Sequence, residues 1–240
     1  MIRLQNIKYS GKVYTRQGDF YYRRAMAGDA EKIAEMYSEC AIHRGNCKER
    51  LKRGEKEAFD RRGGMYLVPD REGIEREIEN PHSFWALFTD HEGEPAGSFW
   101  FSDDNPEIPA VLKQTDTVYP REILVKREYA GRKIGTMLYY TVFEAMLKAG
   151  YLRSVCEVYR TIAYETDGIR YSVDLLNKPS YIDMLMMGGR YEGCGLEKEI
   201  CLLEMKVWVE PHIFSFLHEK TMGLKQEASC FTLQEGIWQG

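Results

Sequence analysis

The sequence lacks the features that would place the protein in a membrane or among disulfide-stabilised secreted proteins. None of its apolar runs approaches the roughly 18 residues that a membrane-spanning helix needs. The first residues, MIRLQNIKYSGKVY, contain no apolar core of a signal peptide. Its 6 cysteines form no C-x-x-C pair and are not spaced with histidines as zinc ligands are. These absences favour a cytoplasmic protein with reduced thiols and predict no membrane span, disulfide framework or metal site.

The sequence also lacks a strong charge bias, internal repeats and low-complexity tracts. Its 33 basic and 37 acidic side chains leave a formal net charge of only −4 and are mixed along the chain. Nucleic acids and anionic membranes attract proteins through concentrated positive charge, so neither is an expected partner. The hydrophobic share of 44% is ample for a packed core, and 240 residues suit one large domain or one domain with appendages.

The hydrophobic patterns that are present predict strands and helices in alternation. A strand is expected around 20–22, and after Asp29 the apolar side chains recur with helical spacing. A short helix over 70–80 leads to the clearest hairpin of the sequence, formed by SFWALFTD and PAGSFWFSD. The elements expected further along are a strand at about 116–125, a helix at about 134–148, a strand at 151–160, a polar connection at 161–176, a short helix closed by Gly188 and Gly189, and a strand that includes 203–210.

This order of elements predicts an α/β (α+β) domain with a mixed sheet flanked by helices. We expect the domain to span residues 1–210, with an inserted basic segment at 44–62 and a C-terminal extension at 211–240 packed on or near it. The 44–62 segment is interpreted first as a solvated helix face. Its alternatives are a lining of an acceptor groove and a docking surface for an acidic carrier.

The segment 125–140, VKREYAGRKIGTMLYY, carries the clearest signal of a binding site. An apolar strand ends at Val125, two glycines relax the backbone, and a helix begins at once. Backbone N–H groups at a helix N-terminus favour an anionic group such as a phosphate. Arg132 and Lys133 add positive charge beside those groups. Taken alone, the spacing fits an ordinary strand-to-helix turn about equally well.

This segment and its surroundings resemble the GNAT superfamily of N-acetyltransferases. Residues 21–37 resemble the family's first strand and helix, and the hairpin at 83–102 resembles its second and third strands. VKREYAGRKIGTML at 125–138 resembles the family's fourth strand, pyrophosphate loop and following helix. LNKPSYIDMLMMGG at 176–189 resembles its later asparagine-containing motif. These pieces occur in family order over about residues 20–209.

The resemblance implies an N-acyltransferase, most directly an acetyltransferase that uses acetyl-CoA as cosubstrate and the amine of a small molecule or protein as acceptor. Its sheet would be mixed, mostly antiparallel and splayed between strands four and five, with the cofactor in the splay. The positions that would contact the cofactor are Leu124, Val125, Gly131, Arg132, Lys133, Ile134, Gly135, Thr136 and Asn177. No metal ion takes part in this chemistry, and a homodimer is compatible with it.

Acyl transfer to an amine needs a base for the ammonium proton and benefits from an acid at the leaving thiolate. By resemblance, Glu122 on the fourth strand is the candidate base, with Tyr119 and Asp116 as alternatives. Tyr181 is the candidate acid, because it shares a helix face with Met184, where many family members have a tyrosine. A solvated strand face for Glu122 and a packing role for Tyr181 are the structural alternatives.

Three positions depart from the family pattern. The chain has Ala130 where Gln or Arg is usual, Lys133 where Gly is usual, and Met184 where a tyrosine is common. They keep a second function open, namely a GNAT-shaped module that binds CoA or regulates without catalysis. A third function, an acyltransferase supplied by an acyl-carrier protein, depends on the basic 44–62 segment as a docking surface.

Overall fold

The computed structural model describes residues 4–15, 18–40, 71–166, 168–174, 184–202, 205–227 and 232–235. Its strands are β1 (Ser10–Thr15), β2 (Gly18–Arg24), β3 (Ser83–Thr89), β4 (Pro95–Ser102), β5 (Thr117–Val125), β6 (Arg153–Thr166), β7 (Ile169–Asp174), β8 (Arg190–Cys194), β9 (Lys198–Leu202), β10 (Met205–Leu217) and β11 (Thr232–Glu235). Its α-helices are α1 (Ala30–Cys40), α3 (Arg71–Glu79), α4 (Ile134–Lys148) and α6 (His218–Glu227). Short 3-10 turns are η1 (Leu4–Asn6), η2 (Ala27–Asp29), η3 (Ala110–Leu112) and η4 (Arg127–Tyr129).

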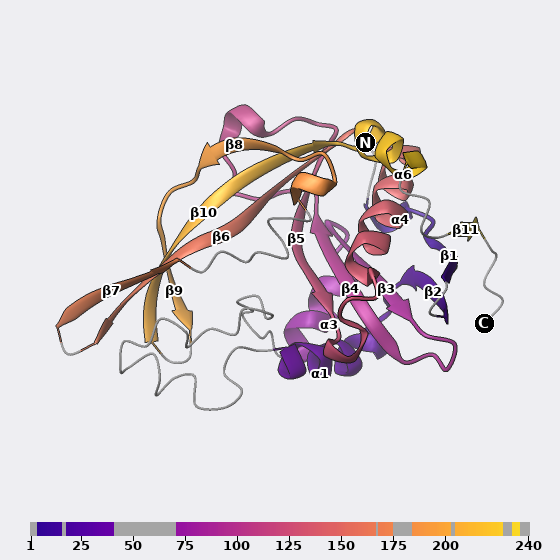
Figure 1. Cartoon of the computed structure of the whole chain (residues 1–240), viewed down its shortest axis with the longest axis horizontal. Coiled ribbons are helices and arrows are strands. Elements are labelled where there is room, and N and C mark those ends of the chain that lie inside the picture. Colours follow the sequence, from indigo (N-terminus) through magenta and orange to yellow (C-terminus); the bar gives the residue numbers. More distant parts are fainter. Residues whose placement is uncertain are drawn as a thin grey trace.

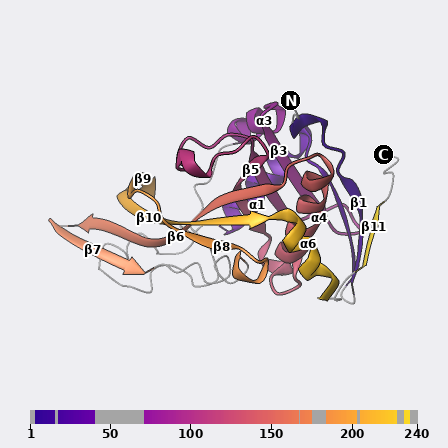
Figure 2. The same cartoon turned by 90° about the horizontal axis from the view of Figure 1, so that it is seen from above.

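The strands of the described residues form one mixed sheet in the order β11-β1-β2-β3-β4-β5-β6-β10-β8. The β5–β6 pair is parallel, and every other neighbouring pair in the described part of the chain is antiparallel. Helices α1 and α3 cover one face of the sheet, and α4 and α6 cover the other (Figures 1 and 2). The predicted mixed sheet flanked by helices is confirmed.

Strand β3 shows how the core divides between the two faces. Its side chains Phe84 and Phe88 pack with α4, whereas Trp85 and Leu87 pack with α1 and α3. Neighbouring side chains of a strand point to opposite faces. With helices on both faces, every position of SFWALFT is buried, and the strand therefore reads as a continuous apolar run.

Most of the predicted elements are confirmed near their expected bounds, including the hairpin of β3 and β4 and the helix α4. The polar connection expected at 161–176 is wrong, because β6 continues to Thr166 and β7 pairs back on it. This hairpin extends away from the body of the sheet, at the far left of Figure 1. Its turn carries Asp167-Gly168 in the sequence, a strong hairpin signal, and Gly168 has the positive φ of 71° that such turns need.

The described residues after position 210 belong to the same sheet and helix layers as the rest of the domain. Strand β10 runs through position 210, where the sequence places the end of the domain, because its alternating apolar side chains continue to Phe214 and Phe216. Helix α6 packs on α4, and β11 pairs with β1. The basic segment 44–62 lies outside the described residues. None of the described helices is long and apolar enough to cross a membrane.

Candidate active site

The parallel strands β5 and β6 meet only at one end. Their register pairs Thr117 with Arg153 and Val118 with Ser154. Beyond these positions β5 remains paired with β4, β6 pairs with β10, and the two strands separate (Figure 1). This opening is the splay predicted between strands four and five. The predicted strands four and five are β5 and β6 in the structure, because β1 was not among the strands predicted from the sequence.

The backbone of β5 has one edge toward β4 and one toward the splay. The N–H of Lys126 donates to the carbonyl of Ala96 at 3.0 Å, so the backbone groups of Lys126 face β4. Successive residues of a strand direct these groups to alternate edges. Leu124 therefore also faces β4 with its backbone, and its side chain is buried against α1 and α3. Val125 and Ile123 direct their backbone groups toward the splay.

The chain then turns tightly into α4, as the sequence predicts. Gly131 has a φ of 82°, and Lys133, directly before the helix, has a φ of 61° and a ψ of 21°. The N–H of Met137 bonds to the carbonyl of Lys133 at 3.0 Å and is the first of the helical ladder. The N–H groups of Ile134, Gly135 and Thr136 precede it and have no partner within the helix. They form the row of donors that a phosphate group would need.

Two contacts hold this turn in place. The hydroxyl of Tyr129 donates to Asp90 Oδ2 at 2.6 Å, which ties η4 to the β3–β4 turn. Gly97 on β4 allows the helix to approach closely, since a Cβ there would lie 2.8 Å from the Leu124 carbonyl oxygen and 3.0 Å from Ile134 Cγ2. The positive charge of Arg132 stays at the turn, with its guanidinium 5.2 Å from the Tyr129 ring centre. The helix N-terminus is therefore fixed beside the end of β5.

Lys133 occupies a left-handed conformation that glycine adopts at no cost, which matches the glycine usual at this position in the family. It is the one residue other than glycine with a positive φ among those described. Lys133→Gly is expected to raise the free energy of unfolding by about 1 kcal/mol or less. The left-handed region costs an ordinary residue roughly 1–2 kcal/mol, and the added freedom of glycine in the unfolded chain offsets part of the gain.

Urea denaturation of the Lys133→Gly variant measures this effect. The matched control is Arg132→Gly. Arg132 has a negative φ, so glycine relieves no strain there, and the variant should lose stability because glycine makes the unfolded chain more flexible. A Lys133→Gly variant less stable than the wild type would show that the lysine side chain stabilises the turn by more than its backbone strain.

Glu122 lies on β5 opposite Trp100, on the face covered by α1. The hydroxyl of Tyr37 on α1 donates to Glu122 Oε2 at 3.0 Å. The pairing shifts between Trp100 and Phe101, which leaves Arg121 as an extra residue in a β-bulge. Burial raises the pKa of Glu122 to about 8, against the lowering effects of the Tyr37 hydrogen bond and the Arg121 charge. A carboxyl with this pKa can accept a proton near neutral pH.

A second titratable group, not predicted from the sequence, faces the same side of the sheet. Tyr159 lies on β6, and burial raises its pKa to about 12, with further contributions from the negative charges of Glu157, Glu107 and Glu122. Lys198 on β9 donates to both Glu107 and Glu157 at 2.5 Å and links these two carboxylates. The phenol of Tyr159 therefore keeps its proton at neutral pH and lies within the field of the Glu122 carboxylate. The alternation of residues along SVCEVY was the sequence signal that could have placed Tyr159 on this face.

A pocket of about 440 Å³ opens next to the bulge, between α3 and the loop after β4. It is lined by Glu77, Asn80, His82, Ser83, Trp100, Ser102, Asp104, Pro106 and Arg121. Trp100 stacks on Trp85 with the ring centres 5.3 Å apart, so the pocket has an aromatic wall. Acidic and basic side chains both line it, which suits an acceptor that carries both charges.

The other predicted residues fall in three places. Tyr181 and Asn177 lie outside the described residues. Met184 is buried and receives a weak hydrogen bond from the Tyr139 hydroxyl at 3.8 Å, so it packs in the core. Tyr119 is buried beside Val155, and Asp116 lies before β5 with its carboxylate 3.8 Å from Arg153 Nε. Of the three candidate bases, Glu122 is the one whose carboxyl group lies on the α1 face at the bulge.

The splayed sheet with a donor-lined helix N-terminus beside it defines a GNAT-type acyltransferase fold. The model of the Acetyltransferase (GNAT) family matches residues 48–165 of the chain, and the resemblance to this family seen in the sequence is thereby confirmed. No curated protein matches the chain in sequence.

Solved structures of GNAT proteins share the fold at low sequence identity. Mycobacterium smegmatis RimJ, in complex with CoA-disulfide, is 14% identical, with a TM-score of 0.60 over 96% of this chain and 99% of that one. An N-acetyltransferase from Staphylococcus aureus Mu50 is 16% identical, with a TM-score of 0.55 over 83% and 98%. The yncA protein of Salmonella typhimurium, solved with its cofactor acetyl-CoA, is 12% identical, with a TM-score of 0.54 over 83% and 94%.

Proposed function

We propose that the protein is an N-acetyltransferase that transfers the acetyl group of acetyl-CoA to an amine by direct attack. The observation that carries the proposal is the place of Glu122, a carboxyl group whose pKa burial raises to about 8, at the bulge of β5 beside the splay. Acetyl-CoA-dependent transfer to an amine requires a phosphate site, an extended cleft for the pantetheine arm and a base at the thioester end of that cleft, and the chain offers a candidate for each.

In this proposal the pyrophosphate of acetyl-CoA is bound by the N–H groups from Gly131 to Thr136, helped by the positive charges of Arg132 and Lys133. The pantetheine arm lies in the splay and pairs with the backbone groups of Val125 and Ile123. Asn177 remains a proposed contact of the cofactor. Most of the rate acceleration comes from holding the thioester and the amine together in the reactive geometry.

The acceptor approaches from the α1 face. Glu122 takes the proton of its ammonium form, directly or through one water, and the neutral amine attacks the thioester carbonyl. A strand N–H near Val125 stabilises the negative charge that develops on the carbonyl oxygen. The nitrogen of the tetrahedral intermediate loses its extra proton to water, and collapse of the intermediate breaks the C–S bond and releases CoA. Tyr181 or Tyr159 donates a proton to the thiolate and regains one from water. The pocket lined by Trp100 and Arg121 is the proposed acceptor site.

Thermal shift and product release together test the proposal. Acetyl-CoA and desulfo-CoA are both expected to raise the melting temperature, because a ligand that binds only the folded state stabilises it. A panel of amines with acetyl-CoA should then show release of the free CoA thiol with at least one acceptor.

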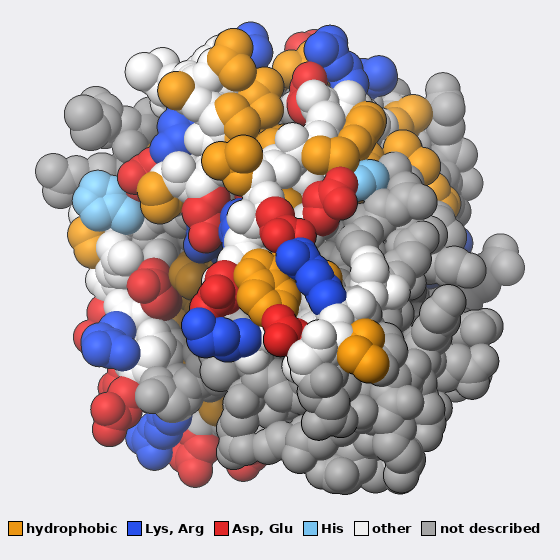
Figure 3. All heavy atoms as spheres, turned by 90° about the vertical axis from the view of Figure 1, so that its left-hand side faces the viewer, with side chains coloured by type: hydrophobic (Ala, Val, Ile, Leu, Met, Phe, Trp, Pro, Cys, Tyr) orange, Lys and Arg blue, Asp and Glu red, His pale blue; other side chains and the backbone are white. Residues whose placement is uncertain are grey.

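The other outcomes point elsewhere. A thermal shift without CoA release on a broad amine panel would favour a CoA-binding or regulatory module. A shift with long-chain acyl-CoA or an acylated carrier protein alone would favour a different donor. No shift with any CoA compound would exclude the proposed donor. In the described part of the surface in Figure 3, acidic and basic side chains are interspersed.

A further inference from the structure

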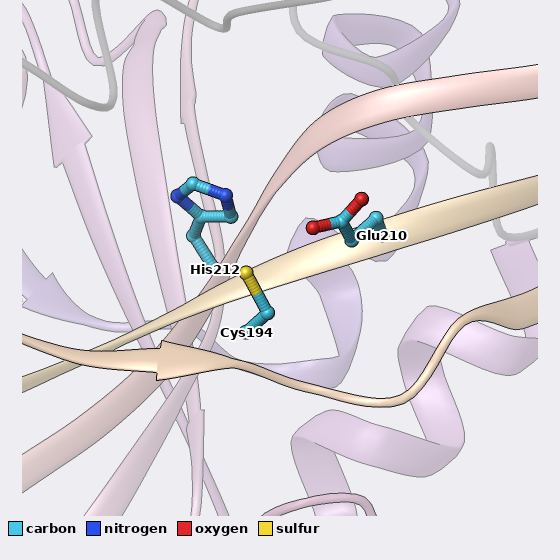
Figure 4. A group of neighbouring side chains, drawn as sticks. All are labelled: Cys194, Glu210 and His212. Carbon is cyan, nitrogen blue, oxygen red and sulfur yellow. The ribbon is translucent and has the colours of Figure 1, made fainter. Parts of the chain in front are cut away.

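Strands β8 and β10 bring three potential metal ligands together on one face of the sheet (Figure 4). Cys194 and His212 are paired directly across the two strands. Glu210 lies two positions before His212 on β10, and side chains two apart on a strand share a face. One donor atom from each of the three residues lies within 4.8 Å of the others. The sheet register therefore assembles a thiol, a carboxylate and an imidazole at one point.

We propose that Cys194, Glu210 and His212 bind a zinc(II) ion. Thiolate sulfur, imidazole nitrogen and carboxylate oxygen are the ligand types that zinc(II) takes in proteins, at about 2.0–2.3 Å. The thiolate and the carboxylate together neutralise the two positive charges of the ion. The two strands already hold the three residues at neighbouring positions, so their donor atoms lie within 4.8 Å of one another without an ion. Cys194 is exposed, so an ion can reach the three ligands from solvent.

The surroundings of the three residues suit a bound cation. The hydroxyl of Tyr191 lies 3.2 Å from Cys194 Sγ and would donate to the thiolate, as outer-shell partners of metal ligands do. The Tyr191 ring also lies 5.0 Å from the His212 ring, which limits the rotation of the buried imidazole. Among the described residues, no basic side chain forms an ion pair with Glu210. A cation at this point would therefore meet negative charge that no described basic side chain compensates.

This site is separate from the proposed acyl-transfer site. His212 shares its face of β10 with Phe214 and Phe216, which pack in the core beneath α4. Glu122 lies on the opposite face, against α1. A metal ion here would hold β8, a strand at the end of the sheet order, against β10 without entering the acetyl-transfer reaction. This proposal departs from the sequence-based expectation of no metal site, because Cys194 and Glu210, 16 positions apart, become neighbours only through strand pairing.

Cobalt(II) titration of the full chain, stripped of metal with a chelator, tests the proposal. We expect one equivalent of cobalt(II) to produce a thiolate-to-cobalt charge-transfer band in the near ultraviolet, and zinc(II) to displace it. Cys194→Ser should abolish the band, and Glu210→Gln should weaken cobalt binding. Tyr191→Phe should lower the affinity roughly 10-fold, as losses of outer-shell partners do. Zinc(II) should raise the melting temperature of the wild type and leave that of Cys194→Ser unchanged.

Cys156→Ser is the matched control. The Cys156 thiol is buried and donates a hydrogen bond to the sulfur of Met184, and it does not belong to the three-residue cluster. It should retain the band. The absence of a cobalt band in the wild type would overturn the proposal, as would a band that persists in Cys194→Ser. Both exposed and half-buried ligands are tested, so the result does not depend on a His212 variant that fails to fold. None of these readouts requires acetyltransferase activity.

Discussion

Glu122→Gln is expected to lower kcat/KM for acetyl transfer by roughly 10²- to 10⁴-fold, the usual contribution of a general base. The wild-type rate should rise with pH through an inflection near 8, because burial raises the pKa of Glu122 to about 8 and only the ionised carboxylate accepts a proton. The glutamine variant should lose this inflection. Initial rates from pH 6 to 9.5 measure both effects. Glu92→Gln, an exposed residue in the β3–β4 turn, is the matched control.

The stability of the same variant separates a catalytic role from a folding defect. The folded protein keeps a proton on Glu122 up to about pH 8, whereas the unfolded chain releases it near the ordinary value of 4.5. The contribution of this group to stability is therefore fully present below pH 4.5 and is lost as the pH rises through 8. Glu122→Gln does not ionise, so its melting temperature should rise relative to the wild type between pH 5 and pH 9.

Tyr37→Phe provides the complementary test of the same carboxyl group. The Tyr37 hydroxyl donates to the ionised carboxylate and lowers the pKa of Glu122, so its removal should move the rate inflection to higher pH. A Glu122→Gln variant with full activity at every pH would remove Glu122 from the mechanism. In that case Tyr159, which faces the same side of the sheet, would be the next candidate for proton transfer.

Local patterns in the sequence were sufficient for much of the fold. The bounds of α4 and of the β3–β4 hairpin follow from helical and turn signals within about ten residues, and both are confirmed. The β6–β7 hairpin was missed although Asp167-Gly168 was available as a turn signal, because its tyrosines and threonines were interpreted as a polar connection. Tyrosine and threonine favour strands, and here they form strands because β6 and β7 pair with each other.

The proposed catalytic face was predicted less completely from the sequence, because the pairing of strands distant in the chain forms it. Glu122 could be chosen from the sequence, but the bulge at Arg121 that places two charged side chains beside Trp100 depends on pairing with β4. Tyr159 meets the field of Glu122 only because β5 and β6 are neighbours at one end of the sheet. Neither the bulge nor the nearness of Tyr159 to Glu122 can be recognised from the spacing of residues in the sequence. The proposed phosphate-binding turn is contiguous in the chain, so its glycines and charges could be recognised in the sequence.

Gly135→Val is expected to weaken acetyl-CoA binding by roughly 10- to 100-fold, since a hydrogen bond to a charged group contributes about 1.5–3 kcal/mol. Gly135 lies in the first turn of α4, where the N–H groups have no partner within the helix. A β-branched side chain would cover those donors and keep the pyrophosphate at a distance. Calorimetric titration with acetyl-CoA and with desulfo-CoA measures the loss.

The matched control is Gly223→Val, the same change in the exposed part of α6, where an added Cβ meets nothing within 4 Å. Both variants replace a helical glycine with a residue of higher helix propensity, so neither should lose stability through the backbone. A loss of affinity confined to Gly135→Val therefore reports on the donors at the helix N-terminus. Unchanged affinity in Gly135→Val would show that the phosphate groups bind elsewhere, and that Lys133 and its neighbours form only a strand-to-helix connection.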